Sequence, residues 1–271
     1  RGYVLRTAYD SLFLYPATIT NAKNQVTSFV YDQKFGVPTQ VTDPNGGVVQ
    51  YVYDAFGRPI EQKVKATDGS MKTVRQAVYD FSVNPVAVTQ TTISGGTDLA
   101  GAAIAVTQKT YFDGFGRPIQ TIAETEGAAN FVTVSKTYDF AGNVKEEFLP
   151  KFATAATYTA PVGTDPKTVT TYDALNRPKT STNSLGTTSV TYNAWQKTVT
   201  DPNGKKKDFL TDAQGNLVSV KEYLAGTPYS TVYTYDQNNN LTKLTDAEGN
   251  LKNLTYNLLG QKVSEEVLHT A

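Results

Sequence analysis

The chain contains no cysteine, so disulfide bonds, thiolate metal sites and cysteine nucleophiles are all excluded. Its single histidine, His269, lies near the end of the sequence, and a catalytic triad or a histidine-ligated metal would need further partners around it. A glycine-rich loop between a strand and a helix, of the kind that holds phosphate groups, is also missing. We therefore predict no cofactor, no metal site and no catalytic residue.

An excess of charge of either sign is lacking as well. Lysine and arginine together number 25, and aspartate and glutamate number 25, so the formal net charge is zero. A chain without excess charge has no long-range attraction for nucleic acid or anionic lipid. We interpret the local run Lys205-Lys206-Lys207 as a solvated strand edge that resists pairing with another sheet. No nucleic-acid partner is predicted.

Long apolar runs and helical periodicity are missing too. No apolar stretch reaches the length that a membrane-spanning helix requires, so no membrane span is predicted. The sequence begins at Arg1, without methionine or a signal peptide. We expect it to be a fragment of a longer chain, with any targeting signal outside it.

What the sequence has instead is a regular spacing of turn-forming residues. Asp10, Asn21, Asp32, Asp43 and Asp54 follow one another at steps of 11 (21−10, 32−21, 43−32, 54−43). That spacing leaves room for one strand and one tight turn. The 17 tyrosines and 12 phenylalanines, with many threonines and valines, are typical of strands. We predict an all-β fold that begins as an unbroken antiparallel meander.

Two turn sequences alternate along the chain. One is Tyr53-Asp54-Ala55-Phe56-Gly57, and the other is Asp43-Pro44-Asn45-Gly46. The aspartate side chain accepts hydrogen bonds from backbone N–H groups two or three residues later, and the glycine adopts positive φ without a steric clash. Both properties suit hairpin loops built on a type I turn followed by a bulge.

The tyrosine–aspartate turn recurs along the chain, with 19 (212−193) to 34 (173−139) residues between successive copies. Repeats of about this length point to a solenoid or another array. We expect each arginine of the motif to pair with a turn aspartate or cover an aromatic ring, and the tyrosines to stack from hairpin to hairpin as an aromatic ladder. The residues assigned to this structural turn motif are Tyr31, Asp32, Gly36, Tyr53, Asp54, Gly57, Arg58, Asp113, Gly116, Arg117, Tyr138, Asp139, Gly142, Tyr172, Asp173, Arg177, Tyr235 and Asp236.

Two segments interrupt this rhythm, at residues 94–106 and 150–167. Both are rich in glycine, alanine, threonine or proline. Connecting segments of this composition usually run over the surface of a protein. We expect both to be inserted loops that project from the sheet.

The motif Tyr-Asp-x-x-Gly-Arg resembles the repeat of the bacterial Rhs/YD-repeat family. Residues 53–60 and 112–119 match that repeat well, whereas the copies at Thr211-Asp212 and Tyr256-Asn257 are degenerate. The resemblance covers almost the whole chain. It implies one continuous repeat array over residues 1–271, interrupted only by the two inserted segments.

The family includes toxin-complex shell proteins, Rhs polymorphic toxins and wall-associated proteins. In it, the repeats form a long β-sheet ribbon that spirals into a hollow shell, and the shell can hold a toxin domain. The resemblance therefore implies a curved or spiral ribbon that forms part of such a shell, in a bacterial protein that is secreted or at the cell surface. This sequence does not contain the segment in which the family cleaves itself, and its repeats are too few to close a cavity without flanking repeats or partner chains.

Other chemistry remains open at three places. The many aspartates raise the alternative of a glycosidase carboxylate pair, although each of them already has a role as a turn cap. The loops at 212–216 and 246–250 resemble calcium loops faintly, because they lack alternating acidic ligands. Trp195, at a turn tip, either packs over the neighbouring strand or stacks on a sugar.

Two functions follow as hypotheses. The first is a non-catalytic structural segment of a shell, whose partners are flanking repeats and an enclosed toxin or other cargo polypeptide. The second is an extracellular adhesion module that binds a glycan or a protein through the loops at 94–106 or 150–167. In either case, unpaired sheet edges at the two ends are expected to pair with other copies unless they are covered.

Overall fold

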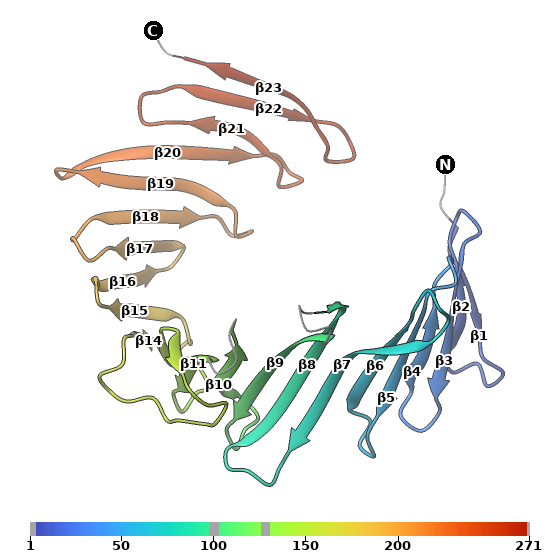
Figure 1. Ribbon diagram of the computed structural model, residues 1–271. Coiled ribbons are helices and arrows are strands. Elements are labelled where there is room, and N and C mark those ends of the chain that lie inside the picture. The colour runs from blue at the N-terminus through green and yellow to red at the C-terminus, as the bar shows by residue number, and fades with distance from the viewer. Residues whose placement is uncertain (1–3, 98–102, 126–130, 270–271) are drawn as a thin grey trace. The chain divides into compact units, whose positions relative to one another are not determined.

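The structure is a computed structural model that describes residues 4–97, 103–125 and 131–269. Every regular element in the described residues is a β-strand, and each strand pairs antiparallel with its neighbours (Figure 1). The predicted all-β fold of tandem hairpins is thereby confirmed. The chain divides into two compact units, Arg1–Ser135 with Pro150–Pro161, and Lys136–Leu149 with Val162–Ala271. Each unit is a sheet of hairpins.

The strands of unit 1 pair in chain order, except that β13 returns to pair with β11. They are β1 (Arg6–Tyr9), β2 (Pro16–Thr20), β3 (Val26–Asp32), β4 (Val37–Thr42), β5 (Val48–Tyr53), β6 (Pro59–Lys65), β7 (Met71–Asp80), β8 (Val86–Thr97), β9 (Ala103–Phe112), β10 (Pro118–Glu124), the first part of β11 (Phe131–Tyr138) and β13 (Lys151–Ala153).

The strands of unit 2 also pair in chain order, and β12 pairs directly with β14. They are the last part of β11, β12 (Val144–Phe148), β14 (Lys167–Tyr172), β15 (Pro178–Asn183), β16 (Gly186–Asn193), β17 (Gln196–Thr200), β18 (Lys206–Thr211), β19 (Leu217–Leu224), β20 (Thr227–Tyr235), β21 (Leu241–Thr245), β22 (Leu251–Tyr256) and β23 (Lys262–Leu268).

The hairpin turns have the bulged type I geometry that their sequences require. In the turn after β5, the Asp54 N–H donates to the Arg58 carbonyl at 2.9 Å, and the Gly57 N–H donates to the Asp54 carbonyl at 3.0 Å. Gly57 has φ of +77°, and the β5–β6 register shifts between Val52 and Tyr53. The bulge lets the two strands keep their right-handed twist through a short loop.

The turn that opens at Asp32 differs from this pattern. Asp32 is still part of β3 and pairs with Val37, and the Gly36 N–H donates to its carbonyl at 2.8 Å. Glycine is therefore the fifth residue of this loop, one position later than in the turns that open at Asp54 and Asp113. The Asp32 side chain nevertheless accepts the Lys34 N–H at 2.8 Å.

Strand register gives unit 1 one polar and one apolar face. The polar face carries Gln40, Gln50, Lys63, Thr91 and Gln120, because these residues are partners across the ladder or alternate with such partners along a strand. The opposite face carries Phe29 and a row of valines, among them Val41, Val49 and Val64. Most of these side chains are only half-buried, since the sheet is a single layer.

The polar face is covered at one place, where a segment that we call the strap, residues 154–161, folds back over β9 and β10. Beneath it lie the most buried residues of the described chain, including Ala87 (2% exposed), Tyr111 (4%), Gln120 (3%) and Ile122 (1%). The strap contributes Ala156 and Tyr158 to this cluster. The Tyr158 ring lies 5.5 Å from the Tyr111 ring, centroid to centroid.

Gln120 holds the strap by its backbone. Its Nε2 donates to the Thr159 carbonyl at 2.7 Å, and its Oε1 accepts the Thr159 N–H at 3.1 Å. The same Nε2 donates to the Ser135 hydroxyl at 2.9 Å, so the buried amide is fully used. A third contact is the Tyr111 hydroxyl, which donates to the Ala156 carbonyl at 3.3 Å.

The segment at 150–167 is not the projecting loop that its composition suggested, and the prediction for the tip of the segment at 94–106 falls outside the described part of the chain. In 94–106, β8 continues to Thr97 and β9 begins at Ala103, so the described part extends a long hairpin, and 98–102 lie outside the described residues. In 150–167, the chain forms β13, then the strap, and then leads into β14. Small residues such as Ala156 allow the strap to lie close to the sheet, and Tyr158 supplies the apolar area that holds it there.

We expect Gln120→Ala to lower the free energy of unfolding of unit 1 by about 1–3 kcal/mol, because it leaves both backbone groups of Thr159 without their partner. Hydrogen exchange of the Thr159 amide should become faster. The matched control is Gln90→Ala, which changes an exposed glutamine of the same unit and should shift stability by less than about 0.5 kcal/mol. Equal effects of the two substitutions would show that the strap is not held by Gln120.

Candidate functional site: the repeated turns

The aspartate of each turn organises the loop that follows it. Asp54 Oδ1 accepts the Phe56 N–H at 2.9 Å and the Arg58 N–H at 3.0 Å. Asp54 Oδ2 accepts Arg58 Nε at 2.7 Å and lies 2.6 Å from Nη2. The pairs Asp113–Arg117 and Asp173–Arg177 repeat this arrangement. Both carboxylate oxygens are therefore occupied, one by the backbone and one by a guanidinium.

The arginine also contacts the tyrosine of the next repeat. The Arg58 guanidinium lies 4.3 Å from the centroid of the Tyr79 ring, and that of Arg177 lies 4.1 Å from the Tyr192 ring. A cation over an aromatic face is attracted by the electron-rich ring. One arginine thus performs both roles expected from the sequence, because it pairs with its own turn aspartate and covers a ring of the following repeat.

The tyrosine hydroxyl closes the link between repeats. Tyr192 donates to the Pro178 carbonyl at 3.0 Å, just after the turn that holds Arg177. The same contact, from a tyrosine to the start of the strand that follows the preceding motif turn, occurs in Tyr53–Pro38 (2.8 Å), Tyr79–Pro59 (3.3 Å), Tyr172–Val144 (2.8 Å) and Tyr235–Leu217 (3.0 Å). At these five tyrosines, one repeat is therefore hydrogen-bonded to the repeat before it.

Turns that end in asparagine are linked in another way. Asn143 Nδ2 donates to its own turn aspartate, Asp139, at 3.1 Å, and to Asn176 Oδ1 of the next motif turn at 2.9 Å. Asn216 makes the corresponding bond to Asn239 at 3.0 Å. Asn176 and Asn239 both have positive φ, so asparagine here takes the place of the turn glycine and adds an acceptor.

The predicted aromatic ladder is therefore mainly an arginine–tyrosine and hydroxyl–carbonyl ladder. The structure shows a stacked tyrosine pair at Tyr15 and Tyr31, with centroids 4.9 Å apart and planes at 20°. Direct packing between turns also occurs at Gly57, where a Cβ would lie 2.8 Å from the Phe35 ring of the preceding turn. The sequence motif identified the participants, but the spacing alone did not identify which repeat each side chain contacts.

The remaining motif residues occupy corresponding places in their turns. Tyr138 ends β11 and Tyr172 ends β14, next to Asp139 and Asp173, and Tyr235 ends β20 before Asp236. Gly36, Gly116 and Gly142 all have positive φ. Asp236 Oδ1 accepts the Asn238 and Asn240 N–H groups, each at 2.9 Å.

Hydrogen bonding lowers the pKa of the turn carboxyls of Asp54, Asp113, Asp173 and Asp236. The Arg177 backbone N–H, followed by its guanidinium, lowers the pKa of Asp173 below the ordinary value of 3.8. The Asn240 side chain and backbone N–H lower the pKa of Asp236 in the same way. For Asp54 and Asp113, desolvation raises the pKa, but the bonds from Arg58 and Arg117 outweigh it and the net shift is downward. These groups are fixed anions and are unsuited to donate protons near neutral pH.

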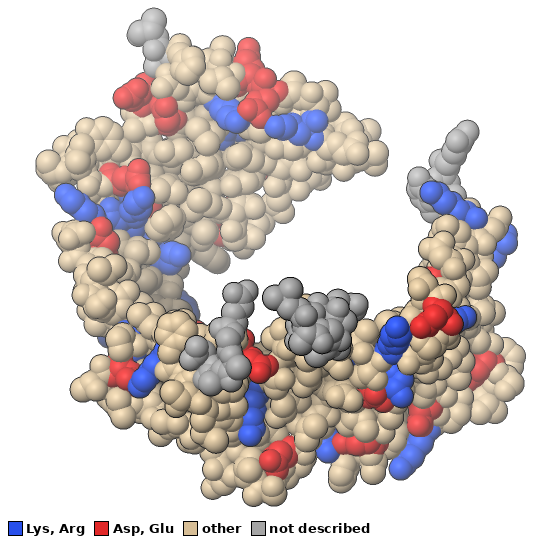
Figure 2. Space-filling model, in the orientation of Figure 1, with Lys and Arg blue, Asp and Glu red and all other residues tan. Residues whose placement is uncertain are grey.

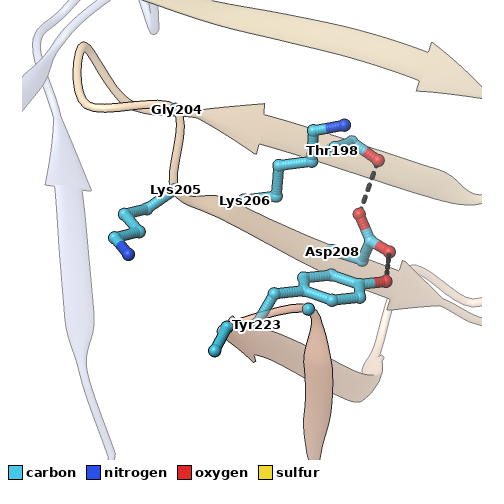
Figure 3. Close-up of a pocket in the computed structure, with 8 residues that line it drawn as sticks. Thr198, Gly204, Lys205, Lys206, Asp208 and Tyr223 are labelled. Atoms are coloured by element: carbon cyan, nitrogen blue, oxygen red, sulfur yellow. Dashed lines mark hydrogen bonds between the residues drawn. The ribbon is translucent and has the colours of Figure 1, made fainter.

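Unit 2 also has an open hollow of about 590 Å³, lined in part by Lys205, Lys206, Asp208 and Tyr223 (Figure 3). Asp208 accepts hydrogen bonds from the Thr198 and Tyr223 hydroxyls, both at 2.7 Å, and these bonds lower its pKa. Asp208 is the one carboxylate among the described lining residues. The hollow therefore lacks the carboxylate pair that a glycosidase needs.

Charge and metal-ligand patterns add no further site. On the face shown in Figure 2, acidic and basic side chains of the described residues are interspersed, without a large area of one sign. Groups of histidine, cysteine, aspartate and glutamate that could hold a metal ion do not occur among the described residues. No helix in this part of the chain is long and apolar enough to cross a membrane.

The tips of the motif turns expose large apolar side chains. They include Phe56 (79% exposed), Phe115 (87%), Phe140 (105%) and Leu175 (71%). Trp195, the other turn-tip aromatic, is 58% exposed and lies beside Tyr192, Lys197 and Phe209 at a second hollow. Exposed apolar side chains therefore recur at the tips of these turns.

The RHS Repeat model matches residues 36–70 and 212–251, and a domain of unknown function, DUF6443, matches residues 85–194. No curated protein sequence matches the chain.

Solved structures share the fold. The crystal structure of TcdB2-TccC3-Cdc42 is similar over 97% of this chain, with a TM-score of 0.83 and 15% identity. A Photorhabdus luminescens Tc holotoxin pore carrying a TccC3 point mutation is similar over 97% of this chain, with a TM-score of 0.77 and 14% identity. The chain spans 19% and 20% of the length of these two matched chains. The likeness shows that the hairpin array is the fold of a segment of those larger proteins.

A double-mutant cycle in unit 2 tests the link between repeats. Arg177→Ala should lower the free energy of unfolding by about 1 kcal/mol, because it removes the aspartate pair and the ring contact together. We expect coupling of about 0.5–1 kcal/mol between Arg177→Ala and Tyr192→Leu, which removes the ring. Tyr192→Phe is the matched control, since it keeps the ring and loses only the bond to Pro178. Coupling of the same size with Tyr192→Phe, which retains the ring, would contradict the cation–ring contact.

The lowered pKa values predict acid sensitivity with a defined sign. Because the folded-state pKa of Asp173 lies below 3.8, the stabilisation is complete above pH 3.8 and is lost as the pH falls through the lower folded value. The thermal midpoint, measured as a function of pH, should decrease once the pH drops below 3.8. A triple variant, Asp54→Asn, Asp113→Asn and Asp173→Asn, should be less stable at neutral pH and show a smaller acid-induced fall. An identical fall in both proteins would refute the assignment.

Proposed function

Because the chain belongs to the Rhs/YD-repeat family, we propose that it is a non-catalytic structural segment of an exported bacterial protein. It forms part of a β-shell that encloses a toxin or other cargo polypeptide. Its action is steric, since strand pairing between repeats builds a wall, and the wall separates the cargo from its surroundings. The protein that contains it would act outside the cell that makes it or at that cell's surface.

The observation that carries this proposal is the structural match between this chain and one segment of longer toxin-complex proteins. Nearly the whole chain superposes on one segment of much longer toxin-complex chains, with 97% of this chain covered. A segment of a wall has no need of a deep core or a catalytic cleft. In the described residues, the compact buried cluster is the one beneath the strap, and the rest of each unit is a single-layered sheet.

The two terminal strands support continuation of the sheet by flanking repeats. Among the described residues, β1 pairs only with β2, and β23 pairs only with β22. All seven residues of β23 are exposed, and so are the four of β1. An open strand edge is a template for further pairing. Flanking repeats of the same protein would satisfy these edges, and other copies would do so if the flanks were removed.

The chemistry of the aspartates argues against a glycosidase. A retaining or inverting enzyme needs one carboxylic acid with a raised pKa beside a carboxylate. The pKa values of Asp54, Asp113 and Asp173 are instead lowered, and each of these carboxylates is hydrogen-bonded within its own loop. Many equivalent caps fit a repeated structural role better than a single reaction.

The alternative is an extracellular adhesion module, and the exposed turn tips favour it most. Phe115 and Trp195 offer rings to a sugar or to a protein. The predicted adhesive loop at 150–167 is less suited to this role, because its strap is held against the sheet by Gln120 and Tyr111. The same exposed tips would be covered in a shell by neighbouring parts of the wall.

Electron microscopy of the native particle that contains this chain, together with its mass, tests the proposal. The expected result is a closed hollow object with internal density and a mass far above 29.4 kDa. An open ribbon, monomer or filament without enclosed volume would contradict it. In that case, a Phe115→Ser and Trp195→Ser variant tested against glycans and host-cell surfaces would decide whether the tips bind a partner.

A further inference from the structure

The strap shows how the polar face of unit 1 binds an extended polypeptide. Gln120 recognises Thr159 through both of its backbone groups, the N–H at 3.1 Å and the carbonyl at 2.7 Å. Neither of these two hydrogen bonds involves the Thr159 side chain. A primary amide that pairs with an N–H and a carbonyl of one residue imitates a neighbouring strand. This mode of recognition does not depend on the sequence of the bound segment.

A second copy of the repeat also has a glutamine at the position of Gln120. Gln120 follows Pro118 by two residues at the start of β10, and Gln40 follows Pro38 by two residues at the start of β4. Register puts both glutamines on the polar face. Gln40 lies directly opposite Gln50 of β5, and Gln50 Nε2 donates to Gln40 Oε1 at 3.0 Å. The two amides therefore form one adjoining polar surface on β4 and β5.

This glutamine pair has unused hydrogen-bonding capacity. Each amide has two N–H donors and one carbonyl acceptor. Beyond the bond that joins the pair, the structure shows a long contact of 3.5 Å from Gln40 Nε2 to Thr42. Both side chains are half-buried, whereas Gln120, beneath the strap, is 3% exposed. The pair thus has the groups that Gln120 uses, and the strap does not reach it.

The surroundings of the pair favour a polypeptide over other ligands. Lys63, the next residue across the ladder, is already paired with Glu61 at 3.1 Å, so no free charge attracts an ion. The neighbouring side chains on this face include Thr42 and Val48, and the Tyr53 hydroxyl donates to the Pro38 carbonyl, two residues before Gln40, at 2.8 Å. The site thus combines amide and hydroxyl groups with apolar surface, which matches an extended backbone with small side chains.

We propose that Gln40 and Gln50 form a docking site for an extended polypeptide backbone, bound as Gln120 binds Thr159. In the parent protein, the occupant is a stretch of the enclosed cargo chain, and this part of the inference rests on the proposed shell function. Backbone recognition suits a wall that must hold an unfolded or changeable cargo, because it selects no particular sequence. The strap is then a built-in example of the interaction.

The test uses the complete chain and a fluorescein-labelled peptide with the sequence of residues 152–161, followed by anisotropy. The wild-type chain should bind this peptide. The variant Gln40→Ala with Gln50→Ala should bind roughly tenfold more weakly, because backbone hydrogen bonds are lost. Gln90→Ala, which changes an exposed glutamine, is the matched control and should bind like the wild type. Circular dichroism and the thermal midpoint would verify that each variant is folded.

A second peptide separates backbone recognition from general adhesion. It carries an N-methyl group on the threonine that corresponds to Thr159, which removes one backbone donor. It should bind the wild type more weakly than the unmodified peptide does, with little difference for the double variant. Absence of binding to the wild type, or equal affinity of wild type and double variant, would overturn the docking site. A hollow particle seen by microscopy together with that result would leave the shell function standing and remove only this site.

Discussion

The contact on which the rest of the structure depends joins the turn of one repeat to the tyrosine of the next. A single-layered sheet buries few side chains, so its strands cannot rely on a common core for their alignment. Here the turn aspartate fixes an arginine, the arginine lies against a tyrosine, and the tyrosine hydroxyl returns to the strand beside that turn. The link is local and can be repeated without limit, which is what a long wall requires.

The link between neighbouring repeats occurs in two chemical forms. In Asp173–Arg177–Tyr192 the connection is a cation over a ring. In Asn143–Asn176 it is an amide hydrogen bond between neighbouring motif turns. The chemistry differs, but both variants couple a capped turn to the next repeat. Stability in such an array is a sum of nearest-neighbour terms, so each link has a small effect alone and a large effect in series.

Much of this could be predicted from the sequence because the turns have demanding local chemistry. Asp54, Gly57 and Arg58 each meet a separate requirement, so their recurrence revealed the hairpins and their spacing. The strap was not predicted, because residues 154–161 contain neither a turn motif nor a clear apolar period. Its binding depends on Gln120, which is distant in sequence and resembles any surface glutamine until the register places it beneath Thr159. The partners of the tyrosines were missed for the same reason, since spacing does not reveal which repeat a side chain reaches.

The array therefore combines repeated links between turns with a polar face that holds the strap by its backbone. If that face surrounds a cargo in the parent protein, the cargo should be inaccessible from outside. The most direct test is limited proteolysis of the intact parent protein, with the cargo followed by an antibody or mass spectrometry. The account predicts that the cargo survives at protease concentrations that destroy the same polypeptide when it is free. Digestion of the cargo at equal rates in both forms would contradict it.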